Sequence, residues 1–244
     1  MENKIIVQPT NDRVLIQTQE LHDEYIAPGF QYDLKSTQAI IDLVKARGSQ
    51  ENTFVFYDDD ESKPRIYVIL DDTVEKRKQC TASYNFEFSD LFTEWKGIMG
   101  HPIGQKPFFD FLKRRDALLE FPEVQALQAA VKQLSLATII NYDAMIEDDN
   151  NYSVAFKIKD MEGSTKLPTD FEIHIPLLNE SDKISDINIE LEIKKPTGDG
   201  PIKADFLLTC PLLHRYIKES VTHEINKVKE ALAGYHILAG NPRS

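Results

Sequence analysis

The sequence predicts an α+β fold, and three patterns along its 244 residues support that prediction. Residues 36–136 combine an N-terminal α/β portion, which contains a hairpin, with a helical middle. From residue 137 onward, apolar and polar residues alternate with a period of two, which predicts an antiparallel β-meander. Apolar residues then recur every three or four positions from 213 to 232, which predicts a long C-terminal helix covering that sheet.

The predicted organisation is an arm followed by one domain. Residues 1–35 hold two short apolar runs, Ile5–Val7 and Val14–Ile16, separated by Pro and Asn, which predicts a strand-like or partly ordered arm. Residues 36–244 read as a single α+β domain with a candidate subdivision near residue 136.

The first elements of the domain are a helix and a hairpin. Ser36 is a good N-cap for a helix over 37–47. The β-rich runs 53–60 and 64–72 flank a short polar segment, which predicts a hairpin with a longer loop. A third run, 84–88, alternates as a strand does.

Three helices are predicted in the middle of the chain. Ser89 can cap a helix over 90–100, and a second helix is expected over 107–119. Pro122 suits the first position of a third helix over 122–134, because proline lacks the N–H that the first turn leaves unbonded.

Five strands are then expected in a single meander. They are separated by turns rich in Asp, Asn, Gly, Pro and Ser, and they cover residues 138–146, 152–160, 170–178, 187–195 and 202–210. Pro211 begins the long helix, Gly234 ends it, and 235–240 forms a final short strand.

Composition excludes several classes of protein. With 28 Lys and Arg against 40 Asp and Glu, the net charge of −12 disfavours a broad surface for nucleic acid or anionic lipid. No apolar run approaches the roughly 20 residues that span a bilayer, and the first 20 residues lack a signal-peptide core. Cys80 and Cys210 read as free thiols of a reducing compartment, so a cytoplasmic protein without membrane contact is expected. Acidic clusters at predicted turns, including 147–149, leave mimicry of nucleic acid as an alternative.

One catalytic pattern is present. Asp170 precedes Glu192 and Lys194 by one strand, as in metal-dependent nucleases of the PD-ExK type, where the acids hold Mg²⁺ and the lysine assists the water or phosphate. An alternating strand with a solvated face produces the same E-x-K spacing. His214 and His223, nine residues apart on one helix, point in opposite directions, so no metal site and no cofactor other than this Mg²⁺ is predicted.

A second candidate is an aromatic and basic surface in the helical middle. Its members can bind a ligand or nucleic acid, and they can equally form the core of a helix pair and a solvated helix face. They are Trp95, Phe108, Phe109, Lys113, Arg114 and Arg115.

The order of these elements resembles a known family. The segments FSDLFTEWKGIMG, QKPFFDFL, DFEIHIPLL, IELEIKKP and AGYHILAGNP resemble the phage and prophage family of the YfdQ type, from about Ser36 to Pro242. Members of that family carry a domain of unknown function with no assigned site residues. The resemblance therefore implies a phage setting and no particular chemistry.

These observations favour a non-enzymatic phage or prophage accessory protein in the host bacterial cytoplasm. It is expected to bind a host protein or a small ligand, for example to counter host defence. The alternatives are the nuclease and a nucleic-acid-binding protein of phage recombination or replication. Edge strands of the meander are also compatible with a homo-oligomer.

Overall fold

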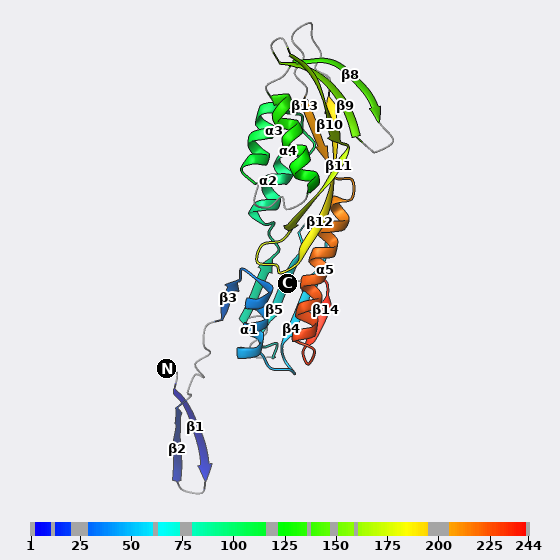
Figure 1. Ribbon diagram of the computed structural model, residues 1–244. Coiled ribbons are helices and arrows are strands. Elements are labelled where there is room, and N and C mark those ends of the chain that lie inside the picture. Colours follow the sequence, from blue (N-terminus) through cyan, green and yellow to red (C-terminus); the bar gives the residue numbers. More distant parts are fainter. Residues whose placement is uncertain are drawn as a thin grey trace. The chain divides into compact units, whose positions relative to one another are not determined.

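The computed structural model describes residues 3–10, 13–20, 29–60, 63–73, 80–115, 122–135, 138–146, 151–158, 161–194 and 205–242. Its elements confirm the α+β class (Figure 1). The ends predicted at 116–119, 159–160 and 202–204, the acidic cluster at 147–149 and the candidate subdivision near 136 lie outside the described residues. None of the described helices is long and apolar enough to cross a membrane.

Contacts divide the chain into two units, Met1–Phe30 and Gln31–Ser244, close to the predicted boundary between residues 35 and 36. In the first unit, β1 (Asn3–Thr10) pairs with β2 (Arg13–Glu20) as an antiparallel hairpin. The two apolar runs identified in the sequence face each other in this pairing, with Val7 opposite Ile16. Two adjacent β-branched runs therefore form one ribbon.

The second unit begins with a five-stranded sheet. Its order is β14-β4-β5-β6-β3, and the bounds are β3 Phe30–Asp33, β4 Phe54–Asp58, β5 Arg65–Ile69, β6 Cys80–Asn85 and β14 His236–Ala239. The predicted β4–β5 hairpin is confirmed, and β14 adds in parallel to β4. The strand expected at 84–88 instead occupies Cys80–Asn85, where residues 81–85 pair antiparallel with Arg65–Ile69 of β5.

Helix α1 (Thr37–Arg47) lies beside this sheet and next to the C-terminal helix. The predicted N-cap is confirmed, since the backbone N–H of Ala39 donates to Ser36 Oγ. Ile40, Ile41 and Val44 are buried, so the apolar stripe of the helix faces inward.

The largest core lies between helices α2 (Asp90–Ile98), α3 (Gln105–Lys113) and α4 (Pro122–Ser135) and two small sheets. The first sheet has the order β11-β12-β13-β7, with bounds Asp170–Pro176, Ile184–Lys194, Asp205–Thr209 and Ile103–Gly104. The predicted Ser89 cap of α2 and the Pro122 start of α4 are both confirmed.

The single five-stranded meander predicted after residue 137 is wrong. The segment forms two sheets, because β8 (Thr138–Ile146), β9 (Asn151–Ile158) and β10 (Met161–Pro168) pair separately from β11, β12 and β13. Strand β10 was not expected, since its sequence MEGSTKLP is polar and reads as a turn. Its Leu167 is nonetheless completely buried, and β10 packs against α4.

The long C-terminal helix, α5 (Leu213–Ala231), is present but does not simply cover the meander. Its first turns contact β12 and the large core through Leu213, Tyr216 and Ile217. Its later turns pack against α1, and Lys229 Nζ lies 4.1 Å from the ring centre of Tyr57 on β4. The helix therefore connects the two sheet regions of the second unit (Figure 1).

Candidate functional site

A cleft of about 870 Å³ lies beside the start of α5. Its lining comes from the segment before β5, the segment that follows β6, helix α2, the loop after β11 and the corner between β13 and α5. The lining residues are Lys63, Pro64, Asn85, Phe86, Phe88, Lys96, Leu178, Cys210, Pro211, Leu213, His214 and Ile217. We call this cavity the basic-rim cleft.

The interior of the cleft is apolar and its rim is basic. Phe86, Phe88, Leu178, Leu213 and Ile217 supply aromatic and aliphatic surface. Three exposed lining side chains, Lys63, Lys96 and His214, are basic, and no described lining residue is acidic. Lys96 Nζ lies 4.4 Å from the ring centre of Phe88, so one cation is held over the apolar surface.

The segments that form the cleft are joined by backbone hydrogen bonds. Ser89 N–H donates to Leu177 O at 3.0 Å, and Asn179 N–H donates to Glu87 O at 2.8 Å. Ser89 Oγ also donates to Pro176 O. The loop carrying Leu178 is thereby held against the segment carrying Phe88, and the cleft is largely preformed.

The cleft holds one thiol. Cys210 is free, and burial raises the pKa of its thiol above the ordinary value, with a smaller opposing effect from the Leu212 backbone N–H. A nucleophilic cysteine needs a lowered pKa, because the thiolate is the reactive form. Burial therefore disfavours the thiolate form of Cys210, whose side chain contributes surface to the cleft.

The candidate nuclease residues lie on the exposed face of β11 and β12. Asp170 stands opposite Glu190 in the strand register, and both line a depression of about 520 Å³ together with Glu192. Lys194 Nζ donates to Glu192 Oε1 at 2.5 Å. The structure thus brings Asp170 and Glu192 to one depression, with Lys194 bound to the second of them.

Glu190 also belongs to this acidic depression and was not predicted. The strand register that brings it opposite Asp170 was the missing information. Tyr152 lies at the edge, and burial, followed by the charges of Glu192 and Glu190, raises the pKa of its hydroxyl. Within the described chain, these acids are not among the residues that bring three metal-ligating atoms within 4.8 Å of one another.

Most of the predicted aromatic and basic surface is core. Trp95 is 1% exposed and Phe108 is 0% exposed, and Phe109 packs half-buried against the same core. Trp95 meets Phe111 edge to face with ring centres 4.8 Å apart. These aromatic side chains therefore stabilise the fold and offer little surface to a ligand.

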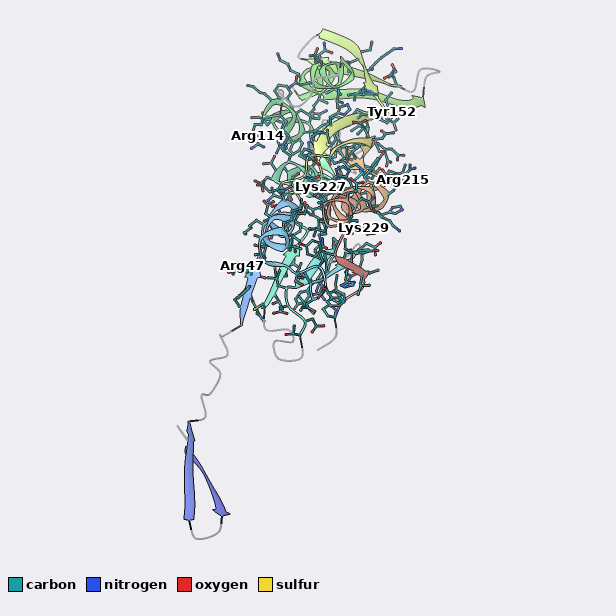
Figure 2. The ribbon with its side chains drawn as sticks, turned by 90° about the horizontal axis from the view of Figure 1, so that it is seen from below. Arg47, Arg114, Tyr152, Arg215, Lys227 and Lys229 are labelled. Atoms are coloured by element: carbon teal, nitrogen blue, oxygen red, sulfur yellow. The ribbon has the colours of Figure 1, made fainter. Side chains whose placement is uncertain are left out.

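The three basic residues of that candidate also separate. Arg115 is 9% exposed, pairs with Glu94, donates to Phe111 O at 3.0 Å and stacks 3.7 Å from the Phe111 ring centre. Lys113 and Arg114 remain exposed, and Arg114, labelled in Figure 2, directly follows α3. A groove built on all three cations is therefore absent, because one of them is engaged within the chain.

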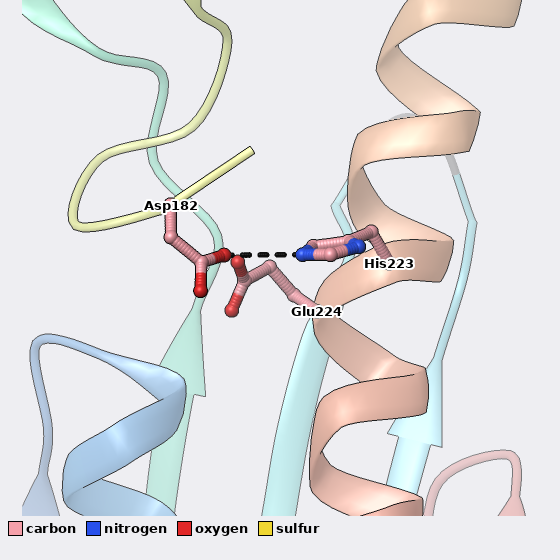
Figure 3. A group of neighbouring side chains, drawn as sticks. All are labelled: Asp182, His223 and Glu224. Carbon is pink, nitrogen blue, oxygen red and sulfur yellow. Dashed lines mark hydrogen bonds and ion pairs between the residues drawn. The ribbon is translucent and has the colours of Figure 1, made fainter. Parts of the chain in front are cut away.

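A polar cluster that was not predicted lies where the loop after β11 meets α5 (Figure 3). It consists of Asp182, His223 and Glu224, whose ligand atoms all lie within 4.8 Å of one another. The available signal was Glu224 itself, a charged residue next to Val221 and Ile225 in the apolar stripe of the helix. A charge in a buried stripe indicates a partner.

Comparisons of this chain with protein-family models, with curated proteins and with solved structures found no match. The site must therefore be interpreted from its own side chains and cavities.

Proposed function

We propose that this chain is a non-enzymatic binding protein, and that its basic-rim cleft takes a small amphipathic molecule with an apolar body and one anionic group. The observation that supports this proposal is the combination of an apolar lining with Lys63, Lys96 and His214 at the edge and no described acidic side chain in the lining. Ligand sites are typically apolar cavities with a few placed polar groups.

The basic side chains of the cleft are informative because their charge is opposite to the net charge of the chain. At a net charge of −12, the chain as a whole repels an anion at long range. Within a Debye length of about 8 Å, the local cations dominate over distant charges. The cleft is thus a site where an anion is accepted locally on an otherwise acidic protein.

The apolar body of the ligand is expected to supply most of the affinity. Burial of apolar surface contributes roughly 25 cal/mol per Å², whereas an exposed ion pair contributes about 0–1 kcal/mol. The two lysines therefore contribute the smaller part of the affinity and select the sign and orientation of the ligand. Phe86, Phe88 and Leu178 are the surfaces against which the ligand packs.

Fluorescence titration with anilinonaphthalene sulfonate, displaced by decanoate, tests the proposal. The double variant Lys63→Glu/Lys96→Glu is expected to weaken both ligands by roughly ten-fold. A matched control, Lys45→Glu/Lys218→Glu, changes the net charge equally at exposed positions outside the cleft. Equal affinities in the two double variants would contradict the proposal, and near-UV circular dichroism confirms that each variant is folded.

The role in a phage or prophage, acting on a host protein or small ligand, rests on the sequence resemblance. It is compatible with the cleft, which accepts a small molecule and can also receive an apolar acidic segment of a host protein. Saturation of decanoate binding at one molecule per chain would favour a small-molecule ligand over a segment of a host protein.

A Mg²⁺-dependent nuclease is the second candidate function, and the shared depression of Asp170 and Glu192 is the observation in its favour. Incubation with DNA and Mg²⁺ or Mn²⁺ tests it. Cleavage by the parent protein that is lost in Asp170→Ala and Glu192→Ala would replace the binding proposal. In that mechanism the lysine assists the water or phosphate, so Lys194→Ala is expected to reduce any such cleavage as well.

A further inference from the structure

We propose that Asp182, His223 and Glu224 form a binding site for a divalent transition metal of the Zn²⁺ class, away from the basic-rim cleft. The three side chains come from two segments, the loop after β11 and helix α5. One imidazole nitrogen and two carboxylates are a donor set that suits Zn²⁺.

The distances are compatible with shared coordination. His223 Nε2 and Asp182 Oδ1 lie 3.1 Å apart. Two ligands that are each about 2.0–2.2 Å from one Zn²⁺ lie about 3.0–3.5 Å apart in tetrahedral or octahedral geometry. The third ligand is a carboxylate oxygen of Glu224, which lies within 4.8 Å of the ligand atoms of both Asp182 and His223. Asp182 and His223 are exposed, so small rotations of their side chains can complete the site.

Glu224 supplies the observation that points to a cation. Its side chain is 2% exposed, and its oxygens accept hydrogen bonds from Thr37 Oγ1 and Ser181 Oγ. Among the described residues, both of its partners are hydroxyl groups and no cationic side chain lies within ion-pair distance. Buried charges are normally paired or bound to a metal.

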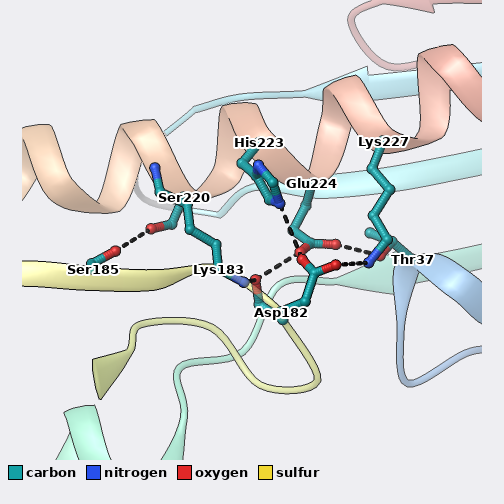
Figure 4. Close-up of polar contacts among 9 residues, drawn as sticks. Thr37, Asp182, Lys183, Ser185, Ser220, His223, Glu224 and Lys227 are labelled. Atoms are coloured by element: carbon teal, nitrogen blue, oxygen red, sulfur yellow. Dashed lines mark hydrogen bonds and ion pairs between the residues drawn. The ribbon is translucent and has the colours of Figure 1, made fainter. Parts of the chain in front are cut away.

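Both carboxylates already have the outer partners that ligating carboxylates use (Figure 4). Lys227 Nζ donates to Asp182 Oδ2 at 3.2 Å, which leaves Oδ1 to face the metal. Thr37 and Ser181 each occupy one oxygen of Glu224, and a carboxylate has about four acceptor positions. The metal can therefore enter without removing these hydrogen bonds, and it replaces only the hydrogen bond between His223 and Asp182.

The effect of the metal is structural. Thr37 begins α1, Ser181 and Asp182 belong to the loop after β11, and His223 and Glu224 belong to α5. A cation at their junction ties these three segments together. Because metal binds the folded chain preferentially, it is expected to raise the melting temperature by about 2–4 °C when free metal exceeds its Kd about five-fold.

The experiment is a calorimetric titration of the chelator-treated full chain with Zn²⁺, together with a titration with Co²⁺ followed by absorption. One metal per chain is expected in the parent protein. His223→Ala is expected to weaken binding at least ten-fold, and Glu224→Gln is expected to do so as well. His101→Ala, which removes an exposed histidine elsewhere, serves as the matched control and keeps the parent affinity.

Two variants, His223→Ala and Glu224→Gln, are used so that the metal site can still be tested if one of them does not fold. His223 is exposed, so its replacement leaves the core intact even if replacement of the buried Glu224 does not. Parent affinity in His223→Ala, or no binding of Zn²⁺ by the parent at about 1 mM, would overturn the proposal and leave the cluster as a network of hydrogen bonds. Neither result bears on the cleft, whose ligand assay contains no metal.

Discussion

The basic-rim cleft and the acidic depression differ in how they are built. The depression lies mainly on one face of β11 and β12, where Asp170, Glu190 and Glu192 project from neighbouring positions of one antiparallel pair. The cleft lies between segments as far apart in the chain as Lys63 and Ile217. The acidic depression therefore forms on the face of one sheet, whereas the basic-rim cleft forms where several elements pack together.

The chemistry follows from that difference. Side chains on the open face of a sheet remain solvated, so the depression is polar and carries negative charge. Side chains between packed elements are partly desolvated, so the cleft is apolar and its cations lie at its edge. An anionic amphiphile is therefore expected to enter the cleft and to avoid the acidic depression.

The largest expected difference between the two hollows is in stability. Leu178 lines the cleft at 1% exposure and packs with Val221 and Ile225, so Leu178→Ala is expected to cost about 2–5 kcal/mol. Glu190→Ala in the depression removes an exposed side chain and is expected to stay within about 0.5 kcal/mol. Urea denaturation measures both, and similar midpoints for the two variants would show that the cleft is not part of the packed interior.

The same difference explains what could be predicted from the sequence. The period of two in 187–194 and the stripe from 213 to 232 identified faces of single elements, and both elements exist. Asp170 and Glu192 were predicted from the metal-dependent nuclease pattern, and the register between β11 and β12 adds Glu190 opposite Asp170. The cleft required the packing of α2 and α5 around Phe88, which no local pattern contains.

Predictions from the sequence failed where tertiary packing, and not the local sequence pattern, determined the structure. Strand β10 was missed because Gly163 and Ser164 read as a turn, yet Leu167 is buried against the helices. The aromatic residues Trp95 and Phe108 were ambiguous between core and surface, and burial assigns them to the core. The polar cluster at Glu224 was not predicted because the spacing of histidines on one helix does not show that Asp182, from another segment, lies beside His223.

An intermediate effect is expected at the cleft thiol. Burial raises the pKa of Cys210, so less thiolate is present near pH 8 than in a free cysteine and alkylation is expected to be several-fold slower. The rate of alkylation by iodoacetamide is measured against pH in a Cys80→Ser background, and its midpoint is expected at a higher pH than that of a free thiol. Decanoate in the cleft is expected to slow the alkylation of Cys210 further. A pH midpoint at or below that of free cysteine would place Cys210 outside an apolar cleft.

The smallest effect is expected at the edge of the acidic depression. Burial is the larger cause of the raised pKa of Tyr152, and the charges of Glu192 and Glu190 add to it, so Glu190→Gln is expected to move that pKa part of the way toward its ordinary value. The folded chain holds this proton more tightly than the unfolded chain, so the stability contribution is present below the ordinary pKa and is lost as pH rises through the raised one. Ultraviolet difference titration of each protein against its Tyr152→Phe version isolates this hydroxyl. A pKa that does not move in Glu190→Gln would show that the acids and the tyrosine do not share one depression.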